Sequence, residues 1–131
     1  MKDEKNVGAI LFVDDDEYCR DIASLIVSNL TNFEIISTHS ASTAIDIVQK
    51  RINEIKIIFL DILMPDMRGS QIYQELVKNH HLANIPVVFQ SGIAENDPEI
   101  KELLKLSNVY NLQKPYDKTQ LIDMINKLVS N

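Results

Sequence analysis

The chain alternates between two kinds of segment that differ in the spacing of their apolar residues. Five short runs are dense in apolar and β-branched residues: 8–13, 33–38, 56–60, 86–90 and 108–112. These runs are apolar throughout rather than at every second position. They therefore predict strands that are buried on both faces, as in a parallel sheet.

Longer amphipathic segments lie between and after these runs and predict helices. Their apolar residues recur every three or four positions, which is the spacing of one helix face. The segments are 16–30, 41–52, 69–79, one that begins at Asp97 and one that begins at Asp117. We expect their apolar stripes to lie in the core, including Tyr18, Ile22 and Leu25 of the first helix.

Local signals mark the starts of three of these helices. Asp16 precedes the first helix, where an acidic cap is favourable. Asp97 and Pro98 combine an N-cap with proline at the first helical position. Asp117 and Gln120 form a variant of the capping box. These residues predict where the chain enters each helix.

Five strands that alternate with five helices predict a three-layer, doubly wound α/β sandwich. Right-handed crossovers restrict the topology, and we adopt the flavodoxin-like strand order 2-1-3-4-5 for the five-stranded parallel sheet. No linker, repeat or low-complexity tract divides the 131 residues. We therefore expect a single domain over residues 1–131, with its core over residues 7–130.

Composition and charge exclude several classes of function. Apolar residues make up 45% of the chain and its net charge is −6, so it is an ordinary globular chain that would bind nucleic acids or anionic membranes poorly. Its three glycines are too scattered for a phosphate-binding loop of the nucleotide-binding kinds. With no secretory leader or bilayer-length apolar run, and one cysteine, we expect a cytoplasmic protein.

Side chains suited to chemistry follow four of the predicted strands. Asp14 and Asp15 follow the first strand, Asp61 the third, Ser91 the fourth and Lys114 the fifth. Ligands of open α/β sheets bind at the carboxyl ends of the strands. We therefore expect three carboxylates, a hydroxyl and an ammonium group to converge at one edge of the sheet.

These groups indicate a magnesium-dependent phosphoryl site. Neighbouring carboxylates destabilise one another unless a cation neutralises them, and Mg²⁺ combines a few carboxylates with water and a phosphate oxygen. Lys114 supplies a positive charge for a phosphoryl group, Ser91 a hydroxyl donor and Gly92 a closely approaching backbone N–H. Together they form a phosphoryl site without a nucleotide loop.

Four motifs resemble those of response regulator receiver domains of two-component signalling, of the chemotaxis-regulator kind, over roughly residues 7–130. In chain order they are LFVDDDE, FLDILMPDMRG, VVFQSG and LQKPY. Each motif alone is weak, but all four occur in order at the ends of the expected strands. Gly69 in the second motif is expected to shape the loop after Asp61.

The resemblance implies a phosphoacceptor signalling domain rather than an enzyme. Asp61 would take a phosphoryl group from a histidine kinase or a histidine phosphotransfer protein. Asp15 and Asp61 would bind Mg²⁺ directly, the Leu63 backbone carbonyl would add a ligand, and Asp14 would act mainly through water. Phosphorylation would alter a surface that contacts an unknown downstream protein.

The resemblance also implies the remaining contacts and the state of the chain. Lys114, Ser91 and the Gly92 N–H would contact the phosphoryl oxygens, and the bond between Lys114 and Pro115 would be cis, which directs the ammonium group inward. The domain would assist its own phosphorylation and dephosphorylation. It would be a monomer or weak dimer, with no nucleic acid or membrane partner.

Some positions depart from the family pattern. Asn111 occupies the usual place of an aromatic switch residue, and its neighbour Tyr110 should point to the opposite face of the sheet. Ser91 stands where threonine is commoner. Leu63 and Ile93, which flank the site, are both apolar. We expect them to position hydrolytic water poorly, so that the acyl phosphate is long-lived for its class.

Other functions remain as alternatives. A magnesium-dependent phosphohydrolase with an aspartate nucleophile would need a second acid two residues after Asp61, where this chain has Leu63. A receiver that binds its partner without being phosphorylated is favoured by Asn111 and opposed by the intact acids and Lys114. A flavin site is weaker still, because the acidic loop after the first strand would repel a phosphate.

Overall fold

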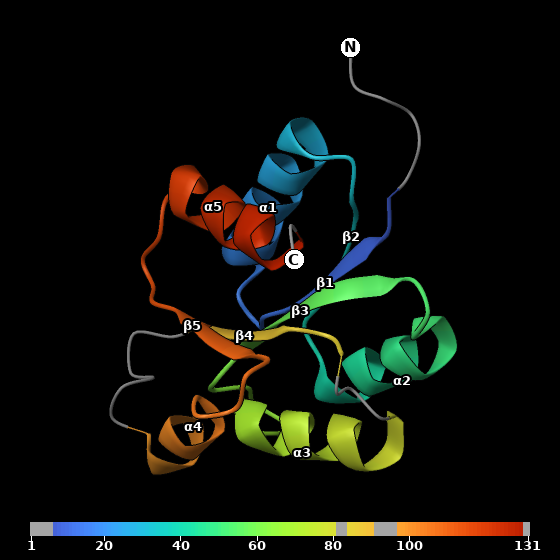
Figure 1. Ribbon diagram of the computed structural model, residues 1–131, viewed down its shortest axis with the longest axis vertical. Coiled ribbons are helices and arrows are strands. Elements are labelled where there is room, and N and C mark those ends of the chain that lie inside the picture. Colours follow the sequence, from blue (N-terminus) through green and yellow to red (C-terminus); the bar gives the residue numbers. More distant parts are fainter. Residues whose placement is uncertain (1–6, 81–83, 91–96, 130–131) are drawn as a thin grey trace.

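The computed structural model describes residues 7–80, 84–90 and 97–129 and contains a five-stranded parallel sheet between two layers of helices (Figure 1). The strands are β1 (Ala9–Val13), β2 (Glu34–Thr38), β3 (Ile55–Asp61), β4 (Val87–Gln90) and β5 (Val109–Leu112). The helices are α1 (Glu17–Leu30), α2 (Ala41–Arg51), α3 (Gly69–His80), α4 (Pro98–Leu103) and α5 (Lys118–Val129). The strand order β2-β1-β3-β4-β5 confirms the predicted flavodoxin-like topology.

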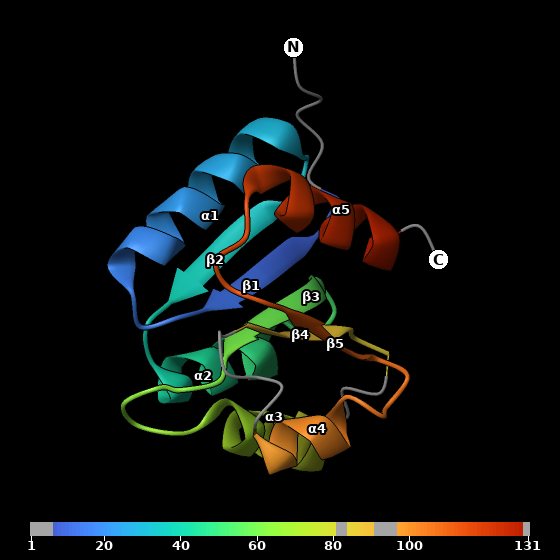
Figure 2. The same ribbon diagram turned by 90° about the vertical axis from the view of Figure 1, so that its left-hand side faces the viewer.

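The helices cover the two faces of the sheet unequally. Helices α1 and α5 lie on one face, and α2, α3 and α4 lie on the other (Figures 1 and 2). Successive residues of a strand point to opposite faces, so β1 sends Phe12 into the first layer and Leu11 into the second. The central strands β1, β3 and β4 are thus buried on both faces, as predicted.

The edge strands depart from that prediction. Most of β2 is half-buried, with Ser37 exposed, and the middle residues of β5, Tyr110 and Asn111, are half-buried. Each of these strands has a neighbour on one side only. A strand at the edge of a sheet is less covered than a central one, so the expectation of burial on both faces was wrong for β2 and β5.

The predicted apolar stripe of α1 was wrong in part, although Ile26 does pack against the core as expected. Tyr18 is 72% exposed and Leu25 is 60% exposed, whereas Ala23 and Val27 are 2% and 1% exposed. Ala23 and Val27 are one helical turn apart, and both pack in the cluster between this helix and the sheet. The larger apolar side chains of α1 consequently lie on the flanks of the buried face.

The predicted helix starts are confirmed. Asp16 and Asp97 cap α1 and α4, each by accepting hydrogen bonds from backbone N–H groups of the first turn, and Pro98 opens α4. Before α5, the Gln120 N–H donates to Asp117 Oδ1 at 2.8 Å and the Asp117 N–H donates to Gln120 Oε1 at 2.9 Å. This reciprocal pair is a capping box.

The helices of the described residues are short compared with a bilayer. The longest of them, α1, has 14 residues. Spanning a bilayer takes about 20 apolar residues. Accordingly, no helix within the described ranges has the length and apolar character needed to cross a membrane.

The register of the sheet brings the carboxyl ends of four strands to one edge. Val13 pairs with Leu60 across β1 and β3, Asp61 pairs with Gln90 across β3 and β4, and Gln90 pairs with Leu112 across β4 and β5. The residues that follow these positions therefore emerge side by side. This edge carries the polar side chains described next.

Candidate functional site

Asp14, directly after β1, is held from both its backbone and its side chain. The Asp14 N–H donates to the Thr38 carbonyl at 3.0 Å, and the Asp14 carbonyl accepts a hydrogen bond from Arg20 Nη1 at 2.8 Å. The Asp16 N–H donates to Asp14 Oδ1 at 2.9 Å. The side chain is fully buried, whereas that of Asp15 is exposed. The two neighbouring acids thus differ strongly in their access to solvent.

Three carboxylates converge at the edge of the sheet, as predicted. Asp14, Asp15 and Asp61 each offer one oxygen, and these oxygens lie within 4.8 Å of one another. Asp61 is 8% exposed at the end of β3. Carboxylate oxygens are the ligands that hard divalent cations prefer. The donor set therefore fits Mg²⁺.

Lys114 completes this cluster from the loop after β5. Its Nζ lies 2.7 Å from Asp14 Oδ2 and 3.9 Å from Asp61 Oδ1. The bond between Lys114 and Pro115 is cis, which the resemblance implied. Three ionised carboxylates and one ammonium group sum to two negative charges, which a divalent cation would balance.

Burial dominates the electrostatics of Asp61 in the metal-free protein. It raises the pKa of this carboxyl from 3.8 to about 7; the Lys114 charge opposes the change and the Asp14 and Asp15 charges add to it. Burial disfavours the charge of Lys114, but its hydrogen bond to Asp14 and the charge of Asp61 outweigh this and raise its pKa. A cation at the cluster would favour the ionised form of Asp61.

Gln90 and Tyr116 also belong to the site, and the sequence analysis did not identify them. Gln90 Nε2 donates to Asp14 Oδ2 at 3.3 Å, and the Tyr116 hydroxyl donates to Gln90 Oε1 at 2.7 Å. An amide at the end of the apolar run VVFQ was the available signal for Gln90. The sequence offered no signal for Tyr116, which reaches Gln90 only through the packing of its loop.

The loop after Asp61 is closed by a backbone contact at Gly69, which confirms the expected role of this glycine. The Gly69 N–H donates to the Ile62 carbonyl at 2.8 Å. A Cβ on Gly69 would lie 2.5 Å from the carbonyl oxygen of Asp61, closer than van der Waals contact allows. Leu63, inside this loop, is 48% exposed.

An ion pair joins this loop to α4. Arg68 Nη2 pairs with Asp97 Oδ2, and Arg68 Nε lies 3.7 Å from Glu99 Oε1. Asp97 is 6% exposed and also caps α4. The segment that follows Asp61 is therefore tied to the start of a helix on the same side of the sheet, a link that the sequence analysis missed.

The remaining predicted site residues have mixed outcomes. Ser91, Gly92 and Ile93 lie outside the described residues, and the metal-ligand role of the Leu63 carbonyl stays a prediction. Tyr110 packs on the α1 and α5 side of the sheet, as expected.

Asn111 replaces the usual aromatic residue with a group that has an unmet hydrogen bond. Its Oδ1 is buried and has no hydrogen-bond partner among the described residues. Tyr110, the adjacent aromatic residue, is packed on the other face, and the Lys127 ammonium nitrogen lies over its ring, 5.2 Å from the ring centroid. Tyr110 therefore does not substitute for the missing aromatic side chain at Asn111.

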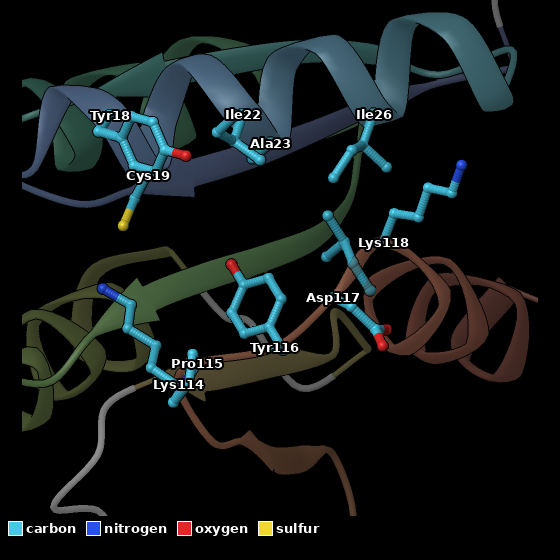
Figure 3. Close-up of a pocket in the computed structure, with 11 residues that line it drawn as sticks. Tyr18, Cys19, Ile22, Ala23, Ile26, Lys114, Pro115, Tyr116, Asp117 and Lys118 are labelled. Carbon is cyan, nitrogen blue, oxygen red and sulfur yellow. The ribbon is translucent and has the colours of Figure 1, made fainter.

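An apolar groove with a volume of about 690 Å³ opens beside the cluster, between α1 and the segment from Lys114 to Leu121. Figure 3 shows Tyr116 rising from that segment toward α1, with Lys114 at one end of the groove. Lys114 and Tyr116 therefore connect the groove to the acidic cluster, through Asp14 and Gln90.

Comparison with known proteins finds one matching family model and several proteins of similar sequence. Residues 10–126 match the family model described as "Response regulator receiver domain". The chain is 31% identical over 94 residues to a probable cyclic di-GMP phosphodiesterase of Vibrio cholerae, covering 72% of this chain and 20% of that protein. It is 26% identical over 121 residues to the response regulator SaeR of Staphylococcus aureus, covering 92% of this chain and 50% of that protein. The chain thus spans half or less of these two relatives.

Solved structures share the fold along nearly the whole chain. The chemotaxis response regulator CheY4 of Vibrio cholerae superposes with a TM-score of 0.81 at 21% identity, covering 95% of this chain and 100% of that one. A CheY-like receiver domain protein from Methanospirillum hungatei has a TM-score of 0.79 at 27% identity, covering 95% of this chain and 96% of that one.

Proposed function

The chain belongs to the response regulator receiver domain family, and on that premise we propose that it is a phosphoacceptor whose Asp61 carries the phosphoryl group. One arrangement carries this proposal. The Asp61 carboxylate stands at the carboxyl end of β3, grouped with two further carboxylates and 3.9 Å from the Lys114 ammonium nitrogen. A nucleophile, a cation-binding set and a positive charge are thereby placed together.

The proposed reaction transfers a phosphoryl group from a phosphohistidine to Asp61. An ionised Asp61 oxygen forms a bond to phosphorus while the bond from phosphorus to the imidazole nitrogen breaks, and the imidazole keeps the electron pair and takes a proton from solvent. Lys114 then turns from Asp14 toward the new negative charge. Neutralising that charge is the largest single contribution that such a site makes.

Magnesium is the cofactor that the cluster fits. Asp14, Asp15 and Asp61 would hold it, with Asp14 acting mainly through water and the Leu63 carbonyl as a further ligand. When bound, it neutralises charge between the carboxylates and the phosphoryl oxygens. The Ser91 hydroxyl and the Gly92 N–H complete the proposed contacts to those oxygens.

We propose a histidine kinase or a histidine phosphotransfer protein as the phosphoryl donor, and a downstream protein as the partner that responds. Phosphorylation adds nearly two negative charges at Asp61. The ion pair between Arg68 and Asp97 links the loop after Asp61 to α4. This link gives the added charge a route to a surface away from the site.

Intact mass measurement tests the proposal. Incubated with Mg²⁺ and a small acyl-phosphate donor, the wild-type chain should gain the mass of one phosphoryl group, and Asp61→Asn should gain none. Asp66→Asn is the matched control, because Asp66 lies in the same loop and, among the described residues, its side chain accepts a hydrogen bond from the Ala41 N–H at 3.1 Å and is not part of the acidic cluster. Phosphorylation of Asp61→Asn at the wild-type rate would contradict the assignment.

We propose that the chain is not a phosphohydrolase. Leu63, two residues after Asp61, cannot serve as the general acid that such a hydrolase places there. Release of many phosphate ions per chain from a small phosphoester would favour the hydrolase instead. The same assay on Asp61→Asn would show whether any such release depends on this site.

A further inference from the structure

Two consecutive hydrogen bonds, one half-buried and one buried, connect Tyr116 to Asp14 through Gln90. The Tyr116 hydroxyl lies 2.7 Å from Gln90 Oε1, and Gln90 Nε2 lies 3.3 Å from Asp14 Oδ2. Gln90 and Asp14 are both fully buried. Polar groups that are removed from water must find hydrogen-bond partners inside the protein. The buried Gln90 and Asp14 side chains therefore stabilise these two hydrogen bonds by pairing with each other.

The Asp14 carboxylate determines which group donates and which accepts in each of these two hydrogen bonds. An ionised carboxylate only accepts hydrogen bonds, so Gln90 must present its NH₂ group to Asp14. Its carbonyl oxygen is then left facing Tyr116, where it needs a donor. Burial raises the pKa of the Tyr116 hydroxyl, which therefore stays protonated and able to donate at neutral pH.

Gln90 is fixed in place by the sheet as well as by its side chain. Its backbone carbonyl accepts a hydrogen bond from the Ile62 N–H at 3.3 Å, immediately after Asp61. It pairs in register with Asp61 on β3 and with Leu112 on β5. The residue therefore joins the strand that carries Asp61 to the side chain of Asp14.

Asp14 has a different set of donors on each oxygen. Oδ1 accepts from the Asp16 N–H, and Oδ2 accepts from Lys114 Nζ and Gln90 Nε2. Lys114 also faces Asp61, so the proposed reaction draws it away from Asp14. Gln90 then remains as the donor that keeps Oδ2 in position.

We propose that Gln90 and Tyr116 are positioning residues of the magnesium site: Gln90 orients the Asp14 carboxylate, and Tyr116 orients Gln90. This inference rests on the proposed function, because it assigns Asp14 to the metal. Partners that orient metal-binding groups typically contribute a factor of about 10–100 to metal affinity. Figure 3 shows Tyr116 on the wall of the groove, and Tyr116→Phe removes only its hydroxyl group and keeps the ring that packs there.

Three variants test the proposal: Gln90→Leu, Tyr116→Phe and the double variant. Affinity for Mg²⁺ alone is measured by calorimetric titration, and stability of the metal-free chain is measured by urea unfolding. Tyr110→Phe is the matched control, because Tyr110 packs on the same side of the sheet but takes no part in the hydrogen bonds that join Tyr116, Gln90 and Asp14. Each single variant should bind Mg²⁺ about 10-fold more weakly or worse, and the control should match the wild type.

The double variant separates positioning from simple packing. It leaves neither partner of the Tyr116 hydrogen bond behind, so its loss of stability should be smaller than the sum of the two single losses. Its Mg²⁺ affinity should stay low, because Asp14 still lacks the amide donor. Wild-type affinity in the double variant, or in Tyr116→Phe, would overturn the proposal.

The two proposals fail in different ways. If the wild-type chain takes no phosphoryl group from the acyl-phosphate donor, the proposed phosphoacceptor function fails. The Mg²⁺ titrations still decide the positioning role in that case, because they need no phosphoryl transfer. Equal losses of Mg²⁺ affinity in Tyr110→Phe and Tyr116→Phe would instead overturn the positioning role alone.

Discussion

Gly69 lies against the backbone of Asp61, so closely that a Cβ at Gly69 would stand 2.5 Å from the Asp61 carbonyl oxygen and 3.1 Å from Ile62 Cα. Both neighbours are backbone atoms and cannot turn away as a flexible side chain would. The conformation of the loop after Asp61 therefore depends on the absence of a side chain at Gly69.

Gly69→Ala should lower the free energy of unfolding by about 1–3 kcal/mol, because the methyl group must displace the backbone of Asp61. It should also slow phosphorylation of Asp61. Urea unfolding and the rate of mass gain measure the two effects. Gly8→Ala serves as the control. The φ of +135° at Gly8 makes this substitution destabilising too, but Gly8 lies directly before β1, at the opposite end of the strand from Asp14. Slower phosphorylation in Gly8→Ala would refute the local explanation.

Lys114→Met should destabilise the metal-free chain by about 1–3 kcal/mol, because the fully buried Asp14 loses a charged hydrogen-bond donor. Saturating Mg²⁺ should restore part of the loss by supplying another positive charge. Thermal or urea unfolding with and without Mg²⁺ measures this. Lys118→Met, an exposed lysine on the same groove, should change little in either condition. An equal loss with and without Mg²⁺ would contradict the expected compensation.

The raised pKa of Asp61 predicts how the stability of the metal-free chain depends on pH. The folded state holds this proton with a pKa of about 7, against 3.8 ordinarily, so the folded state binds more protons between these values. The contribution of Asp61 to stability is therefore complete below about pH 4 and is lost as the pH rises through about 7.

Asp61→Asn isolates this contribution. The variant should be more stable than the wild type at pH 8 by about 2–4 kcal/mol, since a tenfold change in proton affinity corresponds to about 1.4 kcal/mol. Near pH 4 the difference should be small. Urea unfolding across this range in a chelating buffer measures it, and adding Mg²⁺ should narrow the gap at pH 8. A difference that does not vary with pH would contradict the assignment.

The apolar side chain of Leu63 predicts a long-lived acyl phosphate. Leu63 is 48% exposed in the loop after Asp61 and offers no group that orients water for attack. Leu63→Asn should shorten the half-life of the phosphorylated chain, and its folding stability should change by about 0.5 kcal/mol or less. Decay of the phosphorylated mass over time measures this. A wild-type half-life of seconds would show that the flanking residues do not protect the bond.

The topology and most of the acidic site follow from patterns along the chain. The burial of β1, β3 and β4 was readable because their residues are apolar on both faces. The proximity of Asp14, Asp61 and Lys114 could be predicted because parallel strands present their carboxyl ends at one edge of the sheet. Both inferences need only the periodicity of a strand and the direction of the chain.

Other features depend on packing between segments that are distant along the chain. Helical spacing shows that α1 has apolar residues, but it does not show that the small Ala23 and Val27 face the sheet, because that depends on how closely the helix approaches. The Arg68 and Asp97 ion pair likewise joins residues whose distance no local pattern encodes.

The same reason explains why the polar chain behind Asp14 was not foreseen. In the sequence, Gln90 is the last residue of a strand and Tyr116 is a loop residue, and neither position indicates a hydrogen bond between them. That contact forms only when β4, β5 and α1 pack together. Residue order sets which groups a strand end can offer. The packing of the helices against the sheet sets their distances, burial and donors, and so gives Asp61 its pKa of about 7.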